Sequence, residues 1–284
     1  MTRRVGLLGK PLTRRHSQVM HDAAFVAAGI DARYVLMELE PLEVAPTVAT
    51  ARASSEWIGL GVTAPYKRVV AGLVDEVEAD AVEIGAVNNV VRTEDGRLIG
   101  FNTDAPGFRA GVEAALGRPL SGLTVAVAGA GGAAHAVVHA LLRARAASVT
   151  VASRDPAAAD TIVRRFGSLG SAEGVDLGGP AWTDALRRAD LAVNATTVGM
   201  VDPGMTIDVE ALPDEATVFD LVYVPAETPL LRAARARGLR AANGSEMLIQ
   251  QAASAFTRWT GVDGMAHVMR EAVAPLLADA TARA

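Results

Sequence analysis

A glycine-rich segment between an apolar strand and a helical run constrains the fold more than any other feature. Gly129-Ala130-Gly131-Gly132-Ala133-Ala134 follows a predicted strand over 124–128 and opens a predicted helix over 133–143. This spacing fits the G-x-G-x-x-G/A pattern, in which the glycines make a tight turn and admit a pyrophosphate to the backbone. The helix N-terminus would offer free amide groups to the phosphates. A tight turn without a ligand is the alternative, but the flanking strands favour a nucleotide, held by Gly129, Gly131, Gly132 and Ala133.

The end of the next predicted strand, 148–152, bears on which nucleotide is bound. An NAD site usually places an acidic residue there to hold the ribose hydroxyls. Here the strand is followed by Ser153 and Arg154. The fixed donor fork of an arginine suits a 2′-phosphate, so we assign both residues to an NADP site. In the alternative, Arg154 belongs to a loop and Asp155 starts the next helix, which leaves NAD open.

Apolar periodicity indicates strands and helices in alternation along most of the chain. The predicted strands are 5–9, 33–38, 57–62, 124–128, 148–152, 191–195, 217–220 and 240–242, with a hairpin over 88–102 that turns at Asp95-Gly96. The predicted helices of the N-terminal part are 18–28, 41–53, 75–84 and 105–116, and two more helices fill 246–278. The regular alternation after residue 123 predicts a parallel sheet that is covered on both faces. The fold class is therefore α/β with two domains.

Composition excludes several classes of function. The 284 residues are 50% apolar and 21% charged, as expected of a folded globular protein. A net charge of −5 argues against nucleic acid or an anionic membrane as a partner, and the absence of cysteine excludes disulfides and thiolate chemistry. The uncharged stretch 123–142 is long enough to span a bilayer, but its glycines and histidines favour a buried strand and helix. We expect a soluble, cytoplasmic protein, and the five histidines lack a convincing metal-ligand spacing.

Lysine usage singles out one candidate catalytic residue. Only Lys10 and Lys67 occur, although lysine and arginine together number 27. An ammonium can lose its proton within reach of neutral pH, whereas a guanidinium effectively cannot. Lys67 comes just after the apolar run 57–62, where a strand could present it to a cleft. The alternative is a solvated lysine at the start of a helix.

A series of motifs resembles the shikimate dehydrogenase family. The motifs occur in order and cover nearly the whole chain. In chain order they are Gly61-Val62-Thr63-Ala64-Pro65-Tyr66-Lys67, Gly85-Ala86-Val87-Asn88, Asn102-Thr103-Asp104, Asn194-Ala195-Thr196-Thr197-Val198-Gly199-Met200, Asp220-Leu221-Val222-Tyr223-Val224-Pro225 with Thr228-Pro229-Leu230-Leu231, and Asn243-Gly244-Ser245-Glu246-Met247-Leu248-Ile249-Gln250-Gln251-Ala252-Ala253.

The resemblance implies an α/β substrate domain, 1–104 with 246–284, and a Rossmann-type doubly wound parallel-sheet domain, 105–245, with a cleft between them. It implies reversible hydride transfer between NADP(H) and a ring carbon of a cyclic carboxylic acid, with 3-dehydroshikimate on the ketone side, in aromatic amino acid biosynthesis. We expect a monomer or homodimer.

The same resemblance assigns roles to single residues. It implies that Lys67 and Asp104 form a catalytic pair. Reducing a ketone leaves negative charge on its oxygen, so a cation or proton donor must stand beside it, and Lys67 can be both. Asp104 would orient the ammonium. The substrate contacts implied are Thr63, Asn88, Tyr223 and Gln251, and the further cofactor contacts are Thr196 and Met247.

The N-terminal loop departs from the family pattern S-x-S-P-x-x-H, whose serines hold the substrate carboxylate. Ser17 matches the second serine, but Arg15 stands at the first and Gln18 replaces the proline. Either Arg15 pairs with the carboxylate, or its bulk fills that space or points to solvent and the substrate differs. Quinate and aminoshikimate therefore remain alternative substrates. A non-catalytic nucleotide-sensing relative and a folate-type dehydrogenase are the more distant alternatives.

Overall fold

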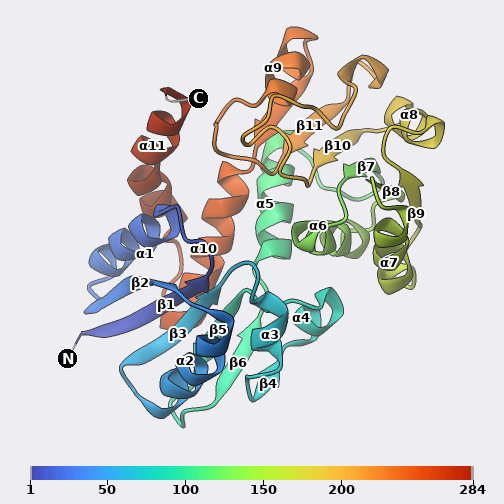
Figure 1. Ribbon diagram of the computed structural model, residues 1–284. Helices are drawn as coiled ribbons and strands as arrows, with labels where there is room; N and C mark the ends of the chain where they lie inside the picture. Colours follow the sequence, from blue (N-terminus) through green and yellow to red (C-terminus); the bar gives the residue numbers. More distant parts are fainter. Residues whose placement is uncertain (1, 283–284) are drawn as a thin grey trace. The chain divides into compact units, whose positions relative to one another are not determined.

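A computed structural model describes residues 2–282, which form two compact units (Figure 1). The first unit comprises residues 2–103 with Ile249–Pro275, and the second comprises Asp104–Leu248 with residues 276–282. Each unit is built on its own six-stranded sheet. Within the described residues, every helix is too short or too polar to cross a membrane. The predicted α/β class is confirmed.

The sheet of the first unit is mixed, with strand order β2-β1-β3-β5-β6-β4. β1 pairs in parallel with both β2 and β3, whereas β3, β5 and β6 form an antiparallel run and β4 pairs in parallel with β6. The bounds are β1 (Arg3–Gly9), β2 (Ala32–Glu38), β3 (Trp57–Val62), β4 (Glu76–Val77), β5 (Asn89–Arg92) and β6 (Leu98–Phe101).

Helices cover both faces of this first sheet. Their bounds are α1 (His16–Ala27), α2 (Pro41–Ala53), α3 (Lys67–Ala71), α4 (Ala79–Ile84), α10 (Ser245–Thr260) and α11 (Ala266–Ala282), the last two continuing from one unit to the other. Apolar residues of α2, α3 and α4 pack with β3 in one core cluster. On α1 and α10, the rings of Phe25 and Phe256 lie 5.1 Å apart, and Trp259 Nε1 donates to Val90 O of β5 at 2.9 Å.

The hairpin predicted over 88–102 is present as β5 and β6, with Gly96 in the left-handed region at φ 89°.

The helix predicted over 75–84 is wrong in its first part. Glu76–Val77 pairs with β6 as β4, and the helix begins only at Ala79. Asp75 explains the difference, because its carboxylate accepts a hydrogen bond from Leu98 N at 2.7 Å and ties this segment to the start of β6.

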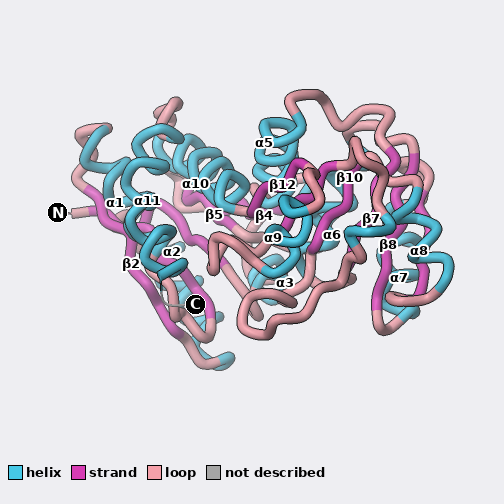
Figure 2. The backbone as a smooth tube through the Cα atoms, turned by 90° about the horizontal axis from the view of Figure 1, so that it is seen from above, coloured by secondary structure: helices cyan, strands magenta, loops and turns pink. Residues whose placement is uncertain are grey.

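The sheet of the second unit is entirely parallel, with strand order β12-β11-β10-β7-β8-β9. Of these strands, β12, β10, β7 and β8 are labelled in Figure 2. Numbered from β7, this is the 3-2-1-4-5-6 order of a doubly wound dinucleotide fold. The strands are β7 (Thr124–Ala128), β8 (Ser148–Ser153), β9 (Ala172–Asp176), β10 (Leu191–Asn194), β11 (Thr217–Asp220) and β12 (Arg240–Asn243). The helices are α5 (Asp104–Leu116), α6 (Gly132–Arg143), α7 (Pro156–Phe166), α8 (Pro180–Arg187), the 3₁₀ helix η1 (Val209–Ala211) and α9 (Pro229–Ala236).

The two faces of this parallel sheet are covered by different helices. Trp182 and Leu186 of α8 and Leu231 of α9 pack in one core cluster with the alanines of β7. On α5, Phe108 meets Phe219 of β11 edge to face at 5.8 Å. The predicted doubly wound architecture is confirmed. The prediction missed β9, whose Ala-Glu-Gly-Val-Asp sequence has no apolar run and is only partly buried at the sheet edge.

Candidate active site

The glycine loop of the second unit leaves β7 through a backbone conformation that only glycine adopts readily. Gly129 has φ 113°, and a Cβ added there would lie 2.9 Å from Thr196 Cγ2 and 3.0 Å from the Ala195 carbonyl. Gly131 is extended and precedes the first residue of α6, and an added Cβ would meet no protein atom within 4 Å. The two glycines therefore have different roles: the first allows the chain to pack, and the second leaves the backbone open.

A cavity of about 420 Å³ opens at this loop. Seven predicted cofactor residues line it together: Gly129, Gly131, Gly132, Ala133, Ser153, Arg154 and Thr196. The prediction did not name the remaining lining residues, which are Ala130, Ala158, Leu177, Ala195 and Thr197. Ala130, Ala195 and Thr197 lie at or just after predicted strand ends, which was the available signal. Leu177 follows β9, which the prediction missed, and Ala158 lies on α7.

Strand order explains why these residues meet. They follow the carboxyl ends of β7, β8, β9 and β10, which all point the same way in a parallel sheet. The order reverses between β7 and β10, and ligands of such sheets bind in the crevice at that switch point. The cavity thus lies where a dinucleotide is expected.

Arg154 is the charged side chain of the cavity lining. It is exposed at the end of β8. Asp155, its neighbour, is used locally: its carboxylate accepts from Ala157 N at 3.1 Å and caps α7, while Asp155 N donates to Ser153 Oγ at 3.2 Å. The carboxylate that could hold ribose hydroxyls, that of Asp155, is therefore engaged in capping α7. The cavity lining instead offers the guanidinium of Arg154.

In the first unit, strand pairing brings several predicted substrate residues to one edge of the sheet. β1 and β3 run in parallel and end there, with Thr63 N donating to Leu8 O at 2.8 Å. β5 begins at the same edge, since Val62 N donates to Asn88 O at 2.8 Å, and β6 ends there opposite Asn89. Residues that follow three strands and precede a fourth therefore converge.

A network of amides and a hydroxyl occupies this edge. Asn88 Nδ2 donates to Thr103 Oγ1 at 3.1 Å and to Gln251 Oε1, on α10, at 3.3 Å. Asn88 Oδ1 accepts from Thr103 N at 2.8 Å and from Asn89 Nδ2 at 2.9 Å. The structure thus joins Asn88 to Gln251 across 163 positions of sequence. Sequence reasoning did not assign Thr103 and Asn89, although Thr103 lies inside the Asn102-Thr103-Asp104 motif.

Lys67 stands beside this network at the first position of α3. It is half-buried, and its carbonyl accepts from Val87 N at 3.0 Å, one residue before Asn88. Lys10 differs, because it forms a partly exposed ion pair with Glu40 that raises the pKa of its ammonium. Asp104 is the first residue of α5 in the second unit. Its pairing with Lys67 stays a prediction because the two belong to different units.

Arg15 and Gln18, the two residues of the N-terminal loop that depart from the family pattern, form hydrogen bonds within the first unit. Arg15 is exposed and precedes α1, and its Nε donates to Gln18 Oε1 at 3.0 Å. Gln18 Nε2 in turn donates to Tyr34 O of β2 at 3.1 Å. The two unusual residues thus support one another. Ser17 is half-buried in the first turn of α1.

Two further predicted site residues lie in the second unit. Tyr223 is half-buried in the segment after β11. Met247 lies in the first turn of α10, and its backbone approaches α5 so closely that a Cβ on Gly111 would be 2.8 Å from Met247 N. Met247 does not belong to the cavity lining. Its nicotinamide role and the substrate role of Tyr223 stay predictions.

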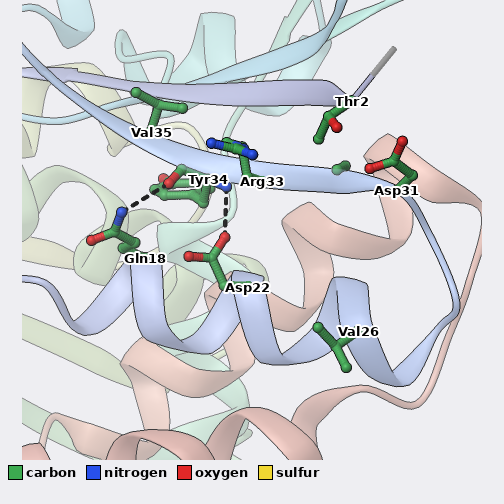
Figure 3. Close-up of a pocket in the computed structure, with 9 residues that line it drawn as sticks. Thr2, Gln18, Asp22, Val26, Asp31, Arg33, Tyr34 and Val35 are labelled. Carbon is green, nitrogen blue, oxygen red and sulfur yellow. Dashed lines mark hydrogen bonds between the residues drawn. The ribbon is translucent and has the colours of Figure 1, made fainter.

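A second cavity, of about 570 Å³, lies in the first unit along the free edge of β2 (Figure 3). Asp22 Oδ1 accepts from Tyr34 N at 2.7 Å, and Gln18 contacts the carbonyl of the same residue. Two side chains of α1 thus occupy both backbone groups of Tyr34 that face away from β1. Edge strands need such protection against pairing with other chains, so this surface has a structural explanation.

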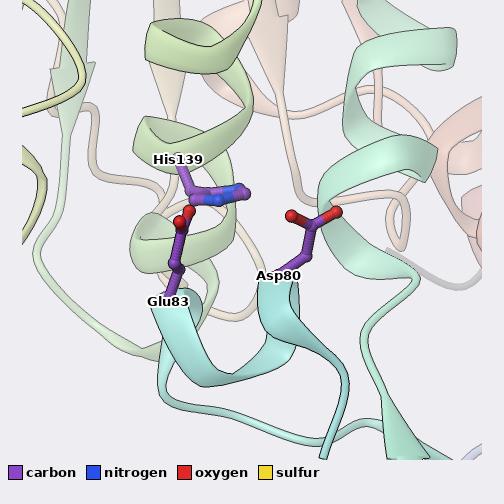
Figure 4. Close-up of side chains that lie close together, drawn as sticks. All are labelled: Asp80, Glu83 and His139. Carbon is purple, nitrogen blue, oxygen red and sulfur yellow. The ribbon is translucent and has the colours of Figure 1, made fainter.

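Three side chains of metal-ligating type are drawn in Figure 4, and they come from different units. Asp80 and Glu83 lie on α4 of the first unit, and His139 lies on α6 of the second. Within the described part of either unit, no group of three such ligands is found. The ring of His139 meets Phe166 edge to face at 5.7 Å, which indicates packing between α6 and α7. We build no metal site from these residues.

Comparisons with known proteins identify the family. The model of the shikimate dehydrogenase substrate binding domain matches residues 7–90, and that of the shikimate 5′-dehydrogenase C-terminal domain matches 244–274. A shikimate dehydrogenase (NADP(+)) of Rubrobacter xylanophilus is 42% identical over 273 residues, covering 95% of this chain and 94% of the relative. The chain belongs to the shikimate dehydrogenase family.

Two solved structures agree with this chain over nearly its whole length. Shikimate 5-dehydrogenase from Thermus thermophilus, in complex with NADP(H) and shikimate, is 36% identical with a TM-score of 0.85, covering 96% of this chain and 99% of that one. Quinate dehydrogenase from Corynebacterium glutamicum, in complex with NAD, is 34% identical with a TM-score of 0.90, again covering 96% and 99%. The predicted family is confirmed.

Proposed function

We propose that this protein is an NADP-dependent oxidoreductase that interconverts shikimate and 3-dehydroshikimate. One observation carries the proposal: the cavity at the β7/β10 switch point combines an open glycine loop with Arg154 as its charged side chain. The loop amides and the α6 N-terminus suit a pyrophosphate, and the guanidinium suits a 2′-phosphate. Relatives that are shikimate dehydrogenases (NADP(+)) support the same cofactor.

The polar edge of the first unit supplies the groups that the reaction needs. NADPH, when bound, supplies the hydride that reduces the ketone carbon. Lys67 then gives a proton to the ketone oxygen, where negative charge develops, and in the reverse direction it accepts the hydroxyl proton. Asp104 orients the ammonium in this proposal.

Amide side chains at the same edge recognise the substrate. Asn88 and Gln251 each carry a donor and an acceptor, which suits ring hydroxyls, and their mutual hydrogen bond holds them ready before binding. Thr63 and Tyr223 complete the hydroxyl contacts. Ser17 and Arg15 bind the carboxylate, with the guanidinium of Arg15 oriented by Gln18.

Quinate with NAD is the second candidate, because a quinate dehydrogenase with NAD is among the similar structures. An initial-rate panel separates the two: shikimate, quinate and an amino-substituted analogue, each with NADP and with NAD, followed by cofactor absorbance. Fastest turnover with shikimate and NADP supports the proposal. Fastest turnover with quinate or the amino analogue would mean that this acid, and not shikimate, is the substrate. Nucleotide binding without turnover of any acid would indicate a nucleotide sensor.

A further inference from the structure

Asn194 lies where β10 ends and one wall of the dinucleotide cavity begins. Its side chain is buried, with 1% exposed, and it does not line the cavity. Asn194 Oδ1 accepts from both Thr196 N at 3.2 Å and Thr196 Oγ1 at 2.6 Å. Because Thr196 does line the cavity, Asn194 fixes this wall from behind.

The same side chain also holds both ends of the segment 199–205. Asn194 Nδ2 donates to Val198 O at 3.1 Å, just before the segment. Asn194 Oδ1 accepts from Thr206 Oγ1 at 3.1 Å, just after it. One buried amide therefore sets the course of the chain at both ends of the segment that follows the cavity wall.

Asp220, at the end of β11, orients this amide. It is fully buried, and its Oδ1 accepts from Asn194 Nδ2 at 2.9 Å and from Val222 N at 3.0 Å, while its Oδ2 accepts from Thr228 Oγ1 at 2.6 Å. Burial raises the pKa of Asp220, but its Oδ1 accepts from the backbone N–H of Val222 and so acts as an acceptor. The NH₂ group of Asn194 must therefore face Asp220. The carbonyl oxygen of Asn194 must then face Thr196 and Thr206.

We propose that Asn194 and Asp220 are a positioning pair for the dinucleotide site, acting through Thr196 without touching the cofactor. This inference rests on the proposed function, since it assumes that the cavity binds NADPH. It predicts that a substitution in the pair weakens NADPH binding and does not weaken substrate binding. The first unit, which carries the proposed substrate groups other than Tyr223, should be unaffected.

Asn194→Asp tests the pair with little change in size. The substitution replaces the donor by a carboxylate that faces Asp220 at 2.9 Å and Val198 O at 3.1 Å, so the segment must move. We expect the NADPH dissociation constant, measured by fluorescence titration, to rise by about tenfold or more. In initial-rate measurements, KM for shikimate should stay within about twofold.

Thr150→Val is the matched control. Thr150 lies on β8, is 6% exposed and donates to Glu173 Oε1 at 2.8 Å, but it does not line the cavity. It should lower the unfolding midpoint and leave NADPH affinity unchanged. If Asn194→Asp does not fold, Thr206→Val removes one bond to Asn194, and an NADPH affinity about threefold weaker is expected.

The outcomes separate the two levels of the proposal. Weaker NADPH binding in the Asn194 or Thr206 variant, with a normal control, supports the positioning pair. If a folded variant binds NADPH as tightly as the wild type does, the positioning pair is overturned and the proposed function stays intact. Wild-type protein that does not bind NADPH would overturn the function itself.

Discussion

The two units present their candidate sites by different physical means. In the second unit, the cavity is lined largely by glycine, alanine and backbone, and the only charged side chain of its lining is Arg154. In the first unit, the sheet edge carries a network of side-chain amides and a hydroxyl next to Lys67. The all-parallel sheet of the second unit aims strand ends and one helix N-terminus at a common point, which makes backbone amides sufficient. The mixed sheet of the first unit lacks that arrangement and relies on side chains.

This difference indicates how each site should respond to substitution. Removal of the proton donor in the first unit should slow the chemical step strongly, because no backbone group can replace it. In the second unit, removal of one side chain should only lower cofactor affinity, and filling the open backbone should lower it at least as much.

The largest effect is expected at Lys67. Lys67→Ala should lower kcat roughly 100-fold or more, with a smaller effect on KM for shikimate, because it removes the proton donor. Steady-state kinetics with shikimate and NADP measures this. Lys10→Ala is the matched control, since Lys10 is paired with Glu40 and should not affect the rate. An unchanged kcat in the Lys67 variant would exclude it as the proton donor.

A smaller effect is expected at Arg154. Arg154→Ala should raise the NADP dissociation constant by about tenfold, because a charge-assisted hydrogen bond to the 2′-phosphate is lost. The NAD dissociation constant should change little, and titrations with both cofactors measure the ratio. Equal losses for NADP and NAD would mean that Arg154 does not read the 2′-phosphate.

A further effect concerns the stability of the first unit rather than its activity. His21 is buried against Tyr34 and Trp259, and burial lowers its pKa from 6.5 to about 3. The unfolded state therefore binds a proton first as the pH falls. The contribution of His21 to the free energy of unfolding is complete above pH 6.5. It is lost as the pH falls towards 3, at about 1.4 kcal/mol per pH unit.

Urea unfolding of the wild type and of His21→Phe, at about pH 7.5 and about pH 5, checks this effect. The phenylalanine variant should lose less stability on acidification, while His267→Phe, which replaces an exposed histidine, should behave as the wild type. If the His21 variant and the wild type share one pH dependence, His21 is not responsible.

Local sequence signals predicted most of the fold, because strands and helices here carry strong apolar periodicity. The predicted helix 41–53 and the predicted strands 57–62 and 124–128 match α2, β3 and β7. Prediction failed for β9 and β4, two short strands at sheet edges whose pairing is a tertiary effect with little apolar signal.

The candidate sites were predictable to different extents. The glycine loop could be found because one contiguous segment makes the turn, and its cavity partners follow strand ends. The joining of Asn88 to Gln251, 163 positions apart, depends on tertiary packing, and only the family resemblance pointed to both residues. The Asn194–Asp220 pair was not predicted as a functional unit, since no local pattern shows which way a buried amide faces.

In the proposed function, the second unit binds its cofactor with open backbone at Gly131. Most residues can adopt the extended conformation of Gly131, and a Cβ there would meet no protein atom. Gly131→Ala should therefore cost about 1 kcal/mol of stability or less, as alanine is a poorer N-cap. Gly129→Ala should be more destabilising, because its Cβ would press on Thr196.

The deciding measurement is the NADPH dissociation constant of Gly131→Ala. We expect a rise of about tenfold or more, because the new methyl group would occupy the place of the pyrophosphate. An unchanged dissociation constant would contradict it.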